Sequence, residues 1–355
     1  MARLGNTKTL WFSVGSLLFA YLIYRVGPWT ILTHLWALGW KLPIIFLPYL
    51  IVYLLDTEGW RYTLGKGTLP FQKLFAIRMA GEAFNHLTPL AYLGGEPLKA
   101  SLLRRHGIPL DQGLASVVVA KTVMTLAQLI FVTWGIALAL WQVKTQGLVF
   151  AGSMALVVLG MPVLLLFTAQ QRGLFAGLLK LMRKLKLPLS RLEKREGDFR
   201  SLDGHILSFY RQNRRGFAIS FLLYFAGWTA GSLEVYLLLR FLGMPISLLT
   251  ALRIEALSTL TKAAAFFIPA SLGAQEGGNI LIFLSFALSF QAGMTFSVVR
   301  RARELFWVAL GLLSLASHKQ RALGPGFLPG PATSFSRPHG PHGKAREPLR
   351  SEGRS

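Results

Sequence analysis

Long apolar stretches constrain this chain more than any other feature of its sequence. A helix needs about 20 apolar residues to cross the ~30 Å hydrocarbon layer of a membrane. Stretches near that length cover residues 9–26, 42–60, 112–141, 148–168, 216–240 and 291–316. Hydrophobic residues make up 53% of the chain and charged residues only 15%, a balance outside the usual range of soluble proteins. The sequence therefore predicts an all-α polytopic membrane protein with about six transmembrane helices.

Two further apolar stretches, residues 71–105 and 248–288, are interrupted near the middle. Each interruption contains Pro and Gly, and each carries charged residues. Backbone that is not helical is tolerated at membrane depth only where protein or a water-filled cavity surrounds it. We therefore expect two re-entrant helical hairpins, which enter and leave the membrane by one face.

The strongly basic balance of the chain fits a membrane protein better than a nucleic-acid binder. The formal net charge is +23, and much of the Lys and Arg lies in residues 170–215 and 318–355, which flank apolar spans. Basic residues accumulate on the cytoplasmic side of membrane proteins, where they also meet anionic lipid headgroups. Both termini are then expected in the cytoplasm. Apolar and basic residues alternate at helical spacing within 170–215, which predicts an amphipathic helix on the membrane surface.

These assignments divide the chain into consecutive parts. Residues 1–41 form a first transmembrane helix and an outer loop. Residues 42–141 form repeat one, with the hairpin 71–105 between two spans, and residues 142–215 hold the fourth span and the basic cytoplasmic segment. Residues 216–316 form repeat two, with the hairpin 248–288 between two spans. The remaining basic tail, 317–355, is rich in Pro, Gly and Ser and is expected to be disordered.

The two hairpin regions are related by a shift of 180 residues along the chain. The shift aligns Pro89 with Pro269, Glu96 with Glu276, Gly113 with Gly293, and Lys121 with Arg301. Chance matches between two apolar segments of similar composition are the alternative. In the expected topology the two units face opposite ways, and inverted repeats with broken helices are typical of secondary transporters. We therefore predict an inverted repeat.

Two stretches, one in each hairpin region, resemble the signatures of a known family. "AFNHLTPLAYLGGEPLKASLLRRHGIPLDQGLASVVVAKT" and "FFIPASLGAQEGG", the latter followed by "FSVVRRARELFWVALGLL", resemble the paired signatures of the lysylphosphatidylglycerol synthase transmembrane region. This family is also called the flippase-like domain, and a hopanoid-biosynthesis-associated membrane protein is a relative. The resemblance covers about residues 8–316. It implies a multi-pass protein of the bacterial cytoplasmic (inner) membrane, or of an archaeal envelope, and movement of an aminoacylated phospholipid between leaflets.

The sequence departs from the family pattern in two places. Synthase members continue into a large soluble aminoacyl-transferase domain, whereas only a short tail follows residue 316 here, so lipid aminoacylation is not expected. Many members carry a basic residue before the Gly-Glu pair, where this chain has Leu93 and Gly94. The headgroup preference of those members therefore does not transfer directly.

Ionisable residues in apolar segments are the main candidates for a lipid-headgroup site. A charge at the bilayer centre costs ~2.5–3.5 kcal/mol on insertion scales, so such residues should face a cavity or a partner. Glutamates of this kind are Glu82, Glu96, Glu234, Glu255, Glu276 and Glu304. The predicted headgroup-binding residues are Asn85, Pro89, Gly94, Gly95, Glu96, Lys99, Lys121, Pro269, Gly273, Glu276, Gly277 and Arg301.

Each of these residues also has a purely structural explanation. Glu96 and Glu276 could complement the start of a helix instead of binding a ligand. The glycines could expose N–H groups to a phosphate, or they could serve flexibility and close helix packing. Lys121 and Arg301 could extend to the membrane interface, and Asn85 could cap a helix end.

Several chemistries have no support in the sequence. The chain has no cysteine, no His-Glu-x-x-His pair, no Gly-x-x-x-x-Gly-Lys loop and no Gly-x-Ser-x-Gly elbow. We therefore expect no metal, no cofactor and no catalytic residue, and we do not expect an enzyme. The predicted function is a flippase for a polar or charged lipid. The alternative is a membrane subunit, scaffold or enzyme of envelope lipid biosynthesis without transport.

The expected partners follow from these assignments. They are a membrane lipid (an anionic or aminoacylated phospholipid, or an isoprenoid lipid), a soluble biosynthetic enzyme, and a second copy of the chain. Nucleic acid is not expected as a partner.

Overall fold

A computed structural model describes most of the chain. The described residues are 21, 24, 28–65, 67–87, 94–140, 146–184, 196–265, 268, 271 and 273–322. The chain divides into two compact units, residues 1–316 and 317–355, and the first contains the candidate site. Its described residues form helices, turns and bends, without a β-strand. The predicted all-α class is therefore confirmed.

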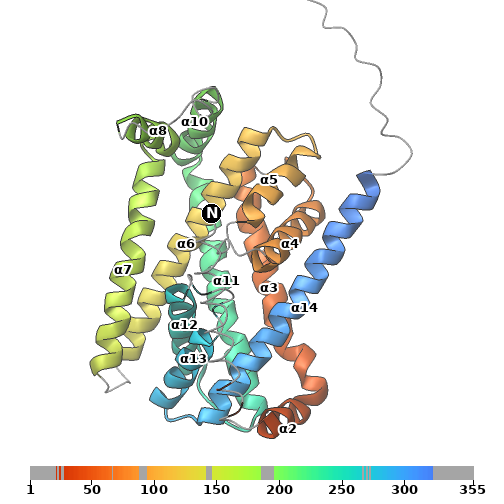
Figure 1. Cartoon of the computed structure of the whole chain (residues 1–355), viewed down its shortest axis with the longest axis vertical. Coiled ribbons are helices and arrows are strands. Elements are labelled where there is room, and N and C mark those ends of the chain that lie inside the picture. Colours follow the sequence, from red (N-terminus) through yellow and green to blue (C-terminus); the bar gives the residue numbers. More distant parts are fainter. Residues whose placement is uncertain are drawn as a thin grey trace, which may run out of the picture. The chain divides into compact units, whose positions relative to one another are not determined.

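The described residues are mostly helical (Figure 1). In chain order the helices are α2 (Pro28–Leu38), the 3-10 helix η1 (Gly39–Lys41), α3 (Leu42–Leu64), α4 (Phe71–Leu87), α5 (Gly95–Arg104), α6 (Leu110–Leu140), α7 (Gln146–Gln170), α8 (Leu174–Lys184), α10 (Glu196–Gln212), α11 (Arg214–Phe241), α12 (Leu248–Ala264), α13 (Ala274–Ser285) and α14 (Phe290–Ala322).

Four helical stretches in the described part are long and apolar enough to cross a membrane. They are Trp36–Leu64, Leu110–Ala139, Gly152–Gln170 and Arg214–Phe241. They contain or closely overlap the predicted spans 42–60, 112–141, 148–168 and 216–240. The chain is therefore a polytopic membrane protein, as predicted.

The two remaining predicted spans have different outcomes. Residues 9–26 lie almost wholly outside the described residues. Residues 291–316 lie within α14, a continuous helix of 33 residues. Charged residues near the middle of α14, among them Arg300, Arg303 and Glu304, explain why this helix is not among the apolar candidates. Helix α14 continues to Ala322, and residues 323–355 of the predicted tail lie outside the described part.

Each predicted hairpin contains two described helices, α4 and α5 in the first and α12 and α13 in the second. In the first, the Asn85 side chain on α4 accepts a hydrogen bond from the Gly95 N–H at the start of α5, at 2.7 Å. In the second, Ser258 on α12 donates to Asn279 on α13. Figure 1 shows α4 and α5 toward the end that carries α8 and α10, and α12 and α13 toward the other end. Pro89 and Pro269 lie outside the described residues, and re-entry into a membrane stays a prediction.

Helix boundaries repeat at the offset seen in the sequence. Helix α6 begins at Leu110 and α14 begins 180 residues later, at Phe290. We refer to α3–α6 as segment one and to α11–α14 as segment two. A Cβ placed on Gly113 would touch Ala100 and Leu103 on α5 at 3.6 Å, and one on Gly293 would touch the corresponding residues of α13, Ile280 and Phe283. In both segments, therefore, a glycine at the aligned position lets the long helix approach the hairpin closely.

The long helix of each segment also crosses the hairpin of the other segment. On α6, Gly135 faces Ala256 of α12 so closely that a Cβ would collide. On α14, Gly311 packs directly on α4, and Ser314 donates to the Ala76 carbonyl of α4 at 3.0 Å. Each segment thus holds the other's hairpin against a long helix.

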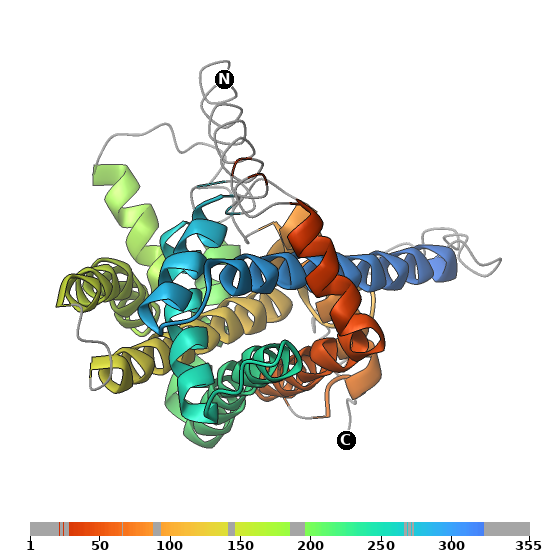
Figure 2. The same cartoon turned by 90° about the horizontal axis from the view of Figure 1, so that it is seen from below.

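Helices α3 and α11 lie side by side along one edge of the bundle (Figure 2). The Ser220 hydroxyl on α11 donates to the Gly59 carbonyl on α3 at 2.9 Å, and the Tyr224 ring covers Gly59. Close contacts between small residues are how helices associate where lipid removes most of the hydrophobic driving force. Apolar side chains from both segments, such as Phe131 and Phe296, complete the buried core.

The described residues of the basic segment after α7 include the helices α8 and α10. The Asp203 carboxylate on α10 accepts hydrogen bonds from the N–H groups of Phe175 and Ala176, at 3.1 and 2.7 Å. A carboxylate at a helix start satisfies N–H groups that the helix leaves unbonded. Helix α8 therefore forms where an amphipathic helix was predicted. Its capping by Asp203 of α10 was not predicted.

Candidate functional site

A cavity of about 360 Å³ lies among helices of both segments. Its lining residues are Tyr49, Val52, Tyr53, Asp56, Arg78, Glu82, His86, Lys121, Met124, Thr125, Gln128, Gly227, Trp228, Thr259, Lys262, Ala263, Arg300 and Arg303. These residues come from α3, α4, α6, α11, α12 and α14. Ionisable groups within the spanning part of a membrane protein are expensive to bury, and they mark substrate or ion pathways by default.

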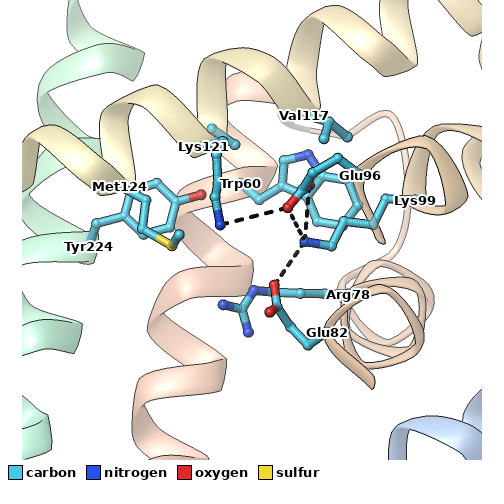
Figure 3. Close-up of a pocket in the computed structure, with 10 residues that line it drawn as sticks. Trp60, Arg78, Glu82, Glu96, Lys99, Val117, Lys121, Met124 and Tyr224 are labelled. Atoms are coloured by element: carbon cyan, nitrogen blue, oxygen red, sulfur yellow. Dashed lines mark hydrogen bonds and ion pairs between the residues drawn. The ribbon is translucent and has the colours of Figure 1, made fainter. Parts of the chain in front are cut away.

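Segment one holds its charges in a chain of ion pairs (Figure 3). Arg78 on α4 donates to Asp56 on α3 at 2.6 Å. The Lys99 ammonium on α5 lies 2.8 Å from a Glu82 oxygen and 3.2 Å from a Glu96 oxygen. One lysine therefore neutralises two carboxylates, and it connects the two helices of the first hairpin.

Lys121 ends this chain of pairs and is held more loosely. Its ammonium lies 3.8 Å from the nearest Glu96 oxygen, and its side chain is 31% exposed. Figure 3 shows Lys121 pointing from α6 toward Glu96 beside the smaller pocket that Trp60, Glu96 and Lys99 help to line. An ammonium at this distance gains less from its partner than one in direct hydrogen-bond contact.

Segment two holds its charges through arginines. Arg300 on α14 donates to Glu255 on α12 and, at 2.9 Å, to Ser258. Arg303, one turn further along α14, donates to Glu234 on α11. The side chains of Glu234 and Arg303 are 0% and 3% exposed. Each guanidinium offers several donors in a fixed plane, so one arginine connects neighbouring helices rigidly.

A third set of pairs in segment two repeats one from segment one. Arg301 lies 2.8 Å from Glu276 and 3.2 Å from Glu304, and Lys262 lies 2.6 Å from Glu304. The Arg301–Glu276 pair occupies the positions that the 180-residue shift assigns to Lys121 and Glu96. The alignment made from sequence therefore matches two ion pairs that the fold forms independently.

The wall of the cavity carries more positive than negative groups. Arg78, Lys121, Lys262, Arg300 and Arg303 line it, whereas the carboxylates among its described lining residues are Asp56 and Glu82. The partners of the segment-two cations, such as Glu234 and Glu255, are not part of the lining. Because a charge is felt most strongly at short distance in a low-dielectric interior, a ligand in the cavity meets the cations first.

The glycines at the helix starts are occupied by contacts within the chain. The Gly95 N–H donates to Asn85, and a Cβ on Gly95 would collide with the Gly81 carbonyl of α4. The Gly273 N–H donates to Glu276 at 2.6 Å, and Gly273 has a positive φ of 76°. The structural alternatives for Asn85, Gly95 and Glu276, capping and close packing, are therefore seen directly.

The remaining predicted residues lie at different distances from the cavity. Lys121 is part of its lining, while Glu96 and Lys99 line the smaller pocket beside it. Arg301 is engaged with carboxylates and is not part of either lining. Gly94 precedes α5, and Gly277 lies in α13 with open space where a Cβ would be. The prediction of a headgroup site at these residues stays a prediction.

Asp56 and Arg78 are among the charged cavity residues that were not predicted from the sequence. Both lie in apolar surroundings, Asp56 inside the predicted span 42–60 and Arg78 in the arm of the first hairpin. An ionisable residue inside a span is itself a signal of function. Applied to every acidic and basic residue of the spans, this rule would have identified both.

The comparison with protein families agrees with this architecture. The sequence model described as Lysylphosphatidylglycerol synthase TM region matches residues 9–311. Because this match covers most of the chain, the chain belongs to that family, as the resemblance predicted. It is therefore a membrane protein of a family connected with lipid synthesis or flipping. No curated protein and no solved structure matches the chain.

Proposed function

We propose that this protein is a lipid translocase, which carries the polar headgroup of a lipid through the charged cavity while the lipid tail stays in the bilayer. The observation that carries this proposal is the position of the cavity, which membrane-spanning helices and ion pairs of both segments surround. Its surroundings are polar enough for a headgroup and lie within helices that are otherwise apolar.

The depth of the cavity supports this function. Lys121 lies 11 residues after the first residue of α6, Leu110. At a rise of 1.5 Å per residue this is about 16 Å along the helix, close to half the thickness of the hydrocarbon layer. A headgroup at Lys121 would therefore lie inside the spanning stretch Leu110–Ala139 and away from its ends, as the sites of many transporters with repeated halves do.

The reciprocal packing of the two segments supports alternating access. Each long helix contacts the hairpin of the other segment, through Gly135 on α6 and through Gly311 on α14. If the segments are inverted repeats, rocking one against the other exposes the cavity to each leaflet in turn. The distribution of Lys and Arg supports a cytoplasmic membrane location with both termini in the cytoplasm.

A transbilayer assay in proteoliposomes tests this function. Phosphatidylglycerol and phosphatidylcholine with a fluorescent acyl chain are compared, and dithionite reports the label in the outer leaflet. Wild-type protein is expected to make label from the inner leaflet accessible for at least one of these lipids. Protein-free liposomes measure the background.

A variant that fills the cavity links the movement to this site. Ala263 lines the cavity, and Ala263→Phe is expected to abolish the added accessibility because the ring takes the space of the headgroup. Ala309→Phe, on an exposed position of α14, is the matched control and should behave as wild type. Equal movement with Ala263→Phe, or none with wild type, would contradict transport through this cavity and favour the scaffold or enzyme alternative.

A further inference from the structure

The pairing of charges around the cavity bears on the kind of headgroup it accepts. We propose that the cavity selects a lipid with an anionic phosphate-ester headgroup and discriminates against a cationic, aminoacylated one. This inference rests on the proposed function and names its substrate class. It sets this chain apart from the aminoacylated phospholipid that the family resemblance suggests.

Among the described lining residues, a cationic headgroup finds no carboxylate that lacks a cation. Of the two carboxylates in the cavity lining, Asp56 accepts from Arg78 at 2.6 Å and Glu82 lies 2.8 Å from Lys99. An entering ammonium would have to displace one of these partners and leave it buried without compensation. Leaving a buried charge without its partner is strongly unfavourable.

Two of the aromatic rings that line the cavity, those of Tyr49 and Tyr53, are engaged by cations as well. The Arg303 guanidinium lies over the Tyr49 ring, 3.2 Å from its centroid, and the Arg78 guanidinium lies 5.0 Å from the Tyr53 centroid. Faces of aromatic rings are the other common binding site for a cationic headgroup. In this cavity two of those faces already carry a guanidinium.

An anionic headgroup meets several donors on the same wall. Arg78, Lys121, Lys262, Arg300 and Arg303 all line the cavity. Within the described part of the chain, the Arg78 Nη1 and Arg303 Nε atoms are buried and have no hydrogen-bond partner, so each guanidinium keeps a donor that its carboxylate does not use. Arginine and lysine are the side chains that bind phosphate, through several donors or as a point charge.

Among the cations that line the cavity, Lys121 gives up the weakest ion pair when it binds a ligand. Its only described partner is Glu96, at 3.8 Å, and Glu96 keeps Lys99 at 3.2 Å when Lys121 leaves. Lys121 therefore moves from Glu96 to the phosphate without leaving a carboxylate unpaired. The other lining cations are held by closer partners, as Arg300 is by Glu255.

Native mass spectrometry of the purified chain with defined lipids tests this selection. The probes are phosphatidylglycerol, phosphatidylcholine and lysyl-phosphatidylglycerol with the same acyl chains, and sn-glycerol 3-phosphate as a soluble phosphate ester. We expect phosphatidylglycerol to bind at least about tenfold more tightly than lysyl-phosphatidylglycerol, because charge-assisted hydrogen bonds to the phosphate are gained without displacing a cation. The soluble ester should compete only weakly, since it lacks the lipid tail.

A pair of charge-matched variants assigns the preference to the cavity. Lys121→Gln is expected to reduce the preference for phosphatidylglycerol several-fold, about the effect of one lost charge-assisted hydrogen bond. Lys180→Gln removes the same charge from an exposed position on α8 and should leave the preference unchanged. Equal effects of the two variants would overturn the proposal, because they would assign the preference to surface charge.

The remaining outcomes separate this inference from the proposed function. Tighter binding of lysyl-phosphatidylglycerol would overturn the selection, and equal affinity for sn-glycerol 3-phosphate would overturn a lipid-borne headgroup. Binding is measured here without any movement between leaflets. A chain that prefers phosphatidylglycerol but does not move it would keep this inference and contradict the proposed function. A chain that moves all three lipids equally and shows no binding preference would support the proposed function and contradict this inference.

Discussion

Segments one and two bury charges at corresponding places but hold most of them with different side chains. Lysines predominate in segment one, beside the pair Arg78–Asp56, and arginines predominate in segment two, beside the pair Lys262–Glu304. In segment one, Lys99 serves both Glu82 and Glu96, and Lys121 lies 3.8 Å from its nearest carboxylate oxygen. In segment two, arginines on α14 hold Glu234, Glu255, Glu276 and Glu304. A lysine is a point charge on a flexible stem, whereas an arginine fixes its partners through a planar fork of donors.

This difference suggests a division of labour between the segments. The arginine pairs of segment two connect α11, α12 and α14 where almost no solvent reaches, as at Glu234 and Arg303. The lysine pairs of segment one can exchange partners, because Glu96 is shared by Lys99 and Lys121. Segment two is then the rigid frame, and segment one supplies the group that responds to the ligand.

The largest loss of stability is expected from a variant that breaks the buried ion pairs of segment two. Glu234→Gln removes the carboxylate that Arg303 holds and that Arg300 approaches at 3.5 Å. Breaking a buried ion pair by removing one partner costs about 3–5 kcal/mol, so the variant should unfold at a much lower temperature. Thermal unfolding of the purified protein in detergent, followed by tryptophan fluorescence, measures the change.

A surface pair provides the control for this variant. Glu58 and Arg61 lie one turn apart on α3, 2.9 Å from each other, and both are about one quarter exposed. Glu58→Gln should change stability by less than about 1 kcal/mol, as is usual for exposed pairs. Similar shifts for Glu58→Gln and Glu234→Gln would show that the segment-two pairs do not form a frame.

An intermediate effect is expected where the first hairpin closes. A methyl group added by Gly95→Ala would collide with the Gly81 carbonyl, so α4 and α5 must separate. Overpacking of this kind costs about 1–3 kcal/mol. The same thermal measurement should show a clear loss of stability.

Gly277 in the second hairpin is the matched control. Space around its Cβ position is open, and it lies inside α13. Gly277→Ala should therefore be neutral or stabilise by about 0.5–1 kcal/mol, because alanine loses less backbone freedom in a helix. Destabilisation by Gly277→Ala as large as that by Gly95→Ala would argue against the close contact in the first hairpin.

The smallest loss of stability is expected for Lys121→Gln, which is compared with Arg301→Gln at the aligned position. Lys121→Gln removes a half-exposed charge with a distant partner, and its cost should stay below about 1 kcal/mol. Arg301→Gln removes direct contacts to Glu276 and Glu304 and should cost more, about 1.5–3 kcal/mol for hydrogen bonds to charged groups. Equal unfolding temperatures for the two variants would contradict the looser hold on Lys121.

Part of the candidate site could be predicted from sequence because its charges stand out in apolar segments. Glu96, Lys121, Glu276 and Arg301 were identified by the 180-residue shift, and the structure pairs Glu96 with Lys121 and Glu276 with Arg301. The glycines could not be assigned in the same way. Whether the Gly95 N–H meets a ligand or Asn85 depends on how α5 returns against α4.

The sequence by itself determined the helical membrane class, the positions of most long helices and the offset that relates the two segments. These features are local, since hydropathy, length and the interruption by Pro and Gly are properties of contiguous residues. The tertiary structure alone decided which charges meet and where a cavity remains. Asp56 and Arg78 are 22 residues apart, and Glu234 and Arg303 are 69 apart. Such pairs exist only because helix packing brings distant segments together in surroundings where an unpaired charge is too costly.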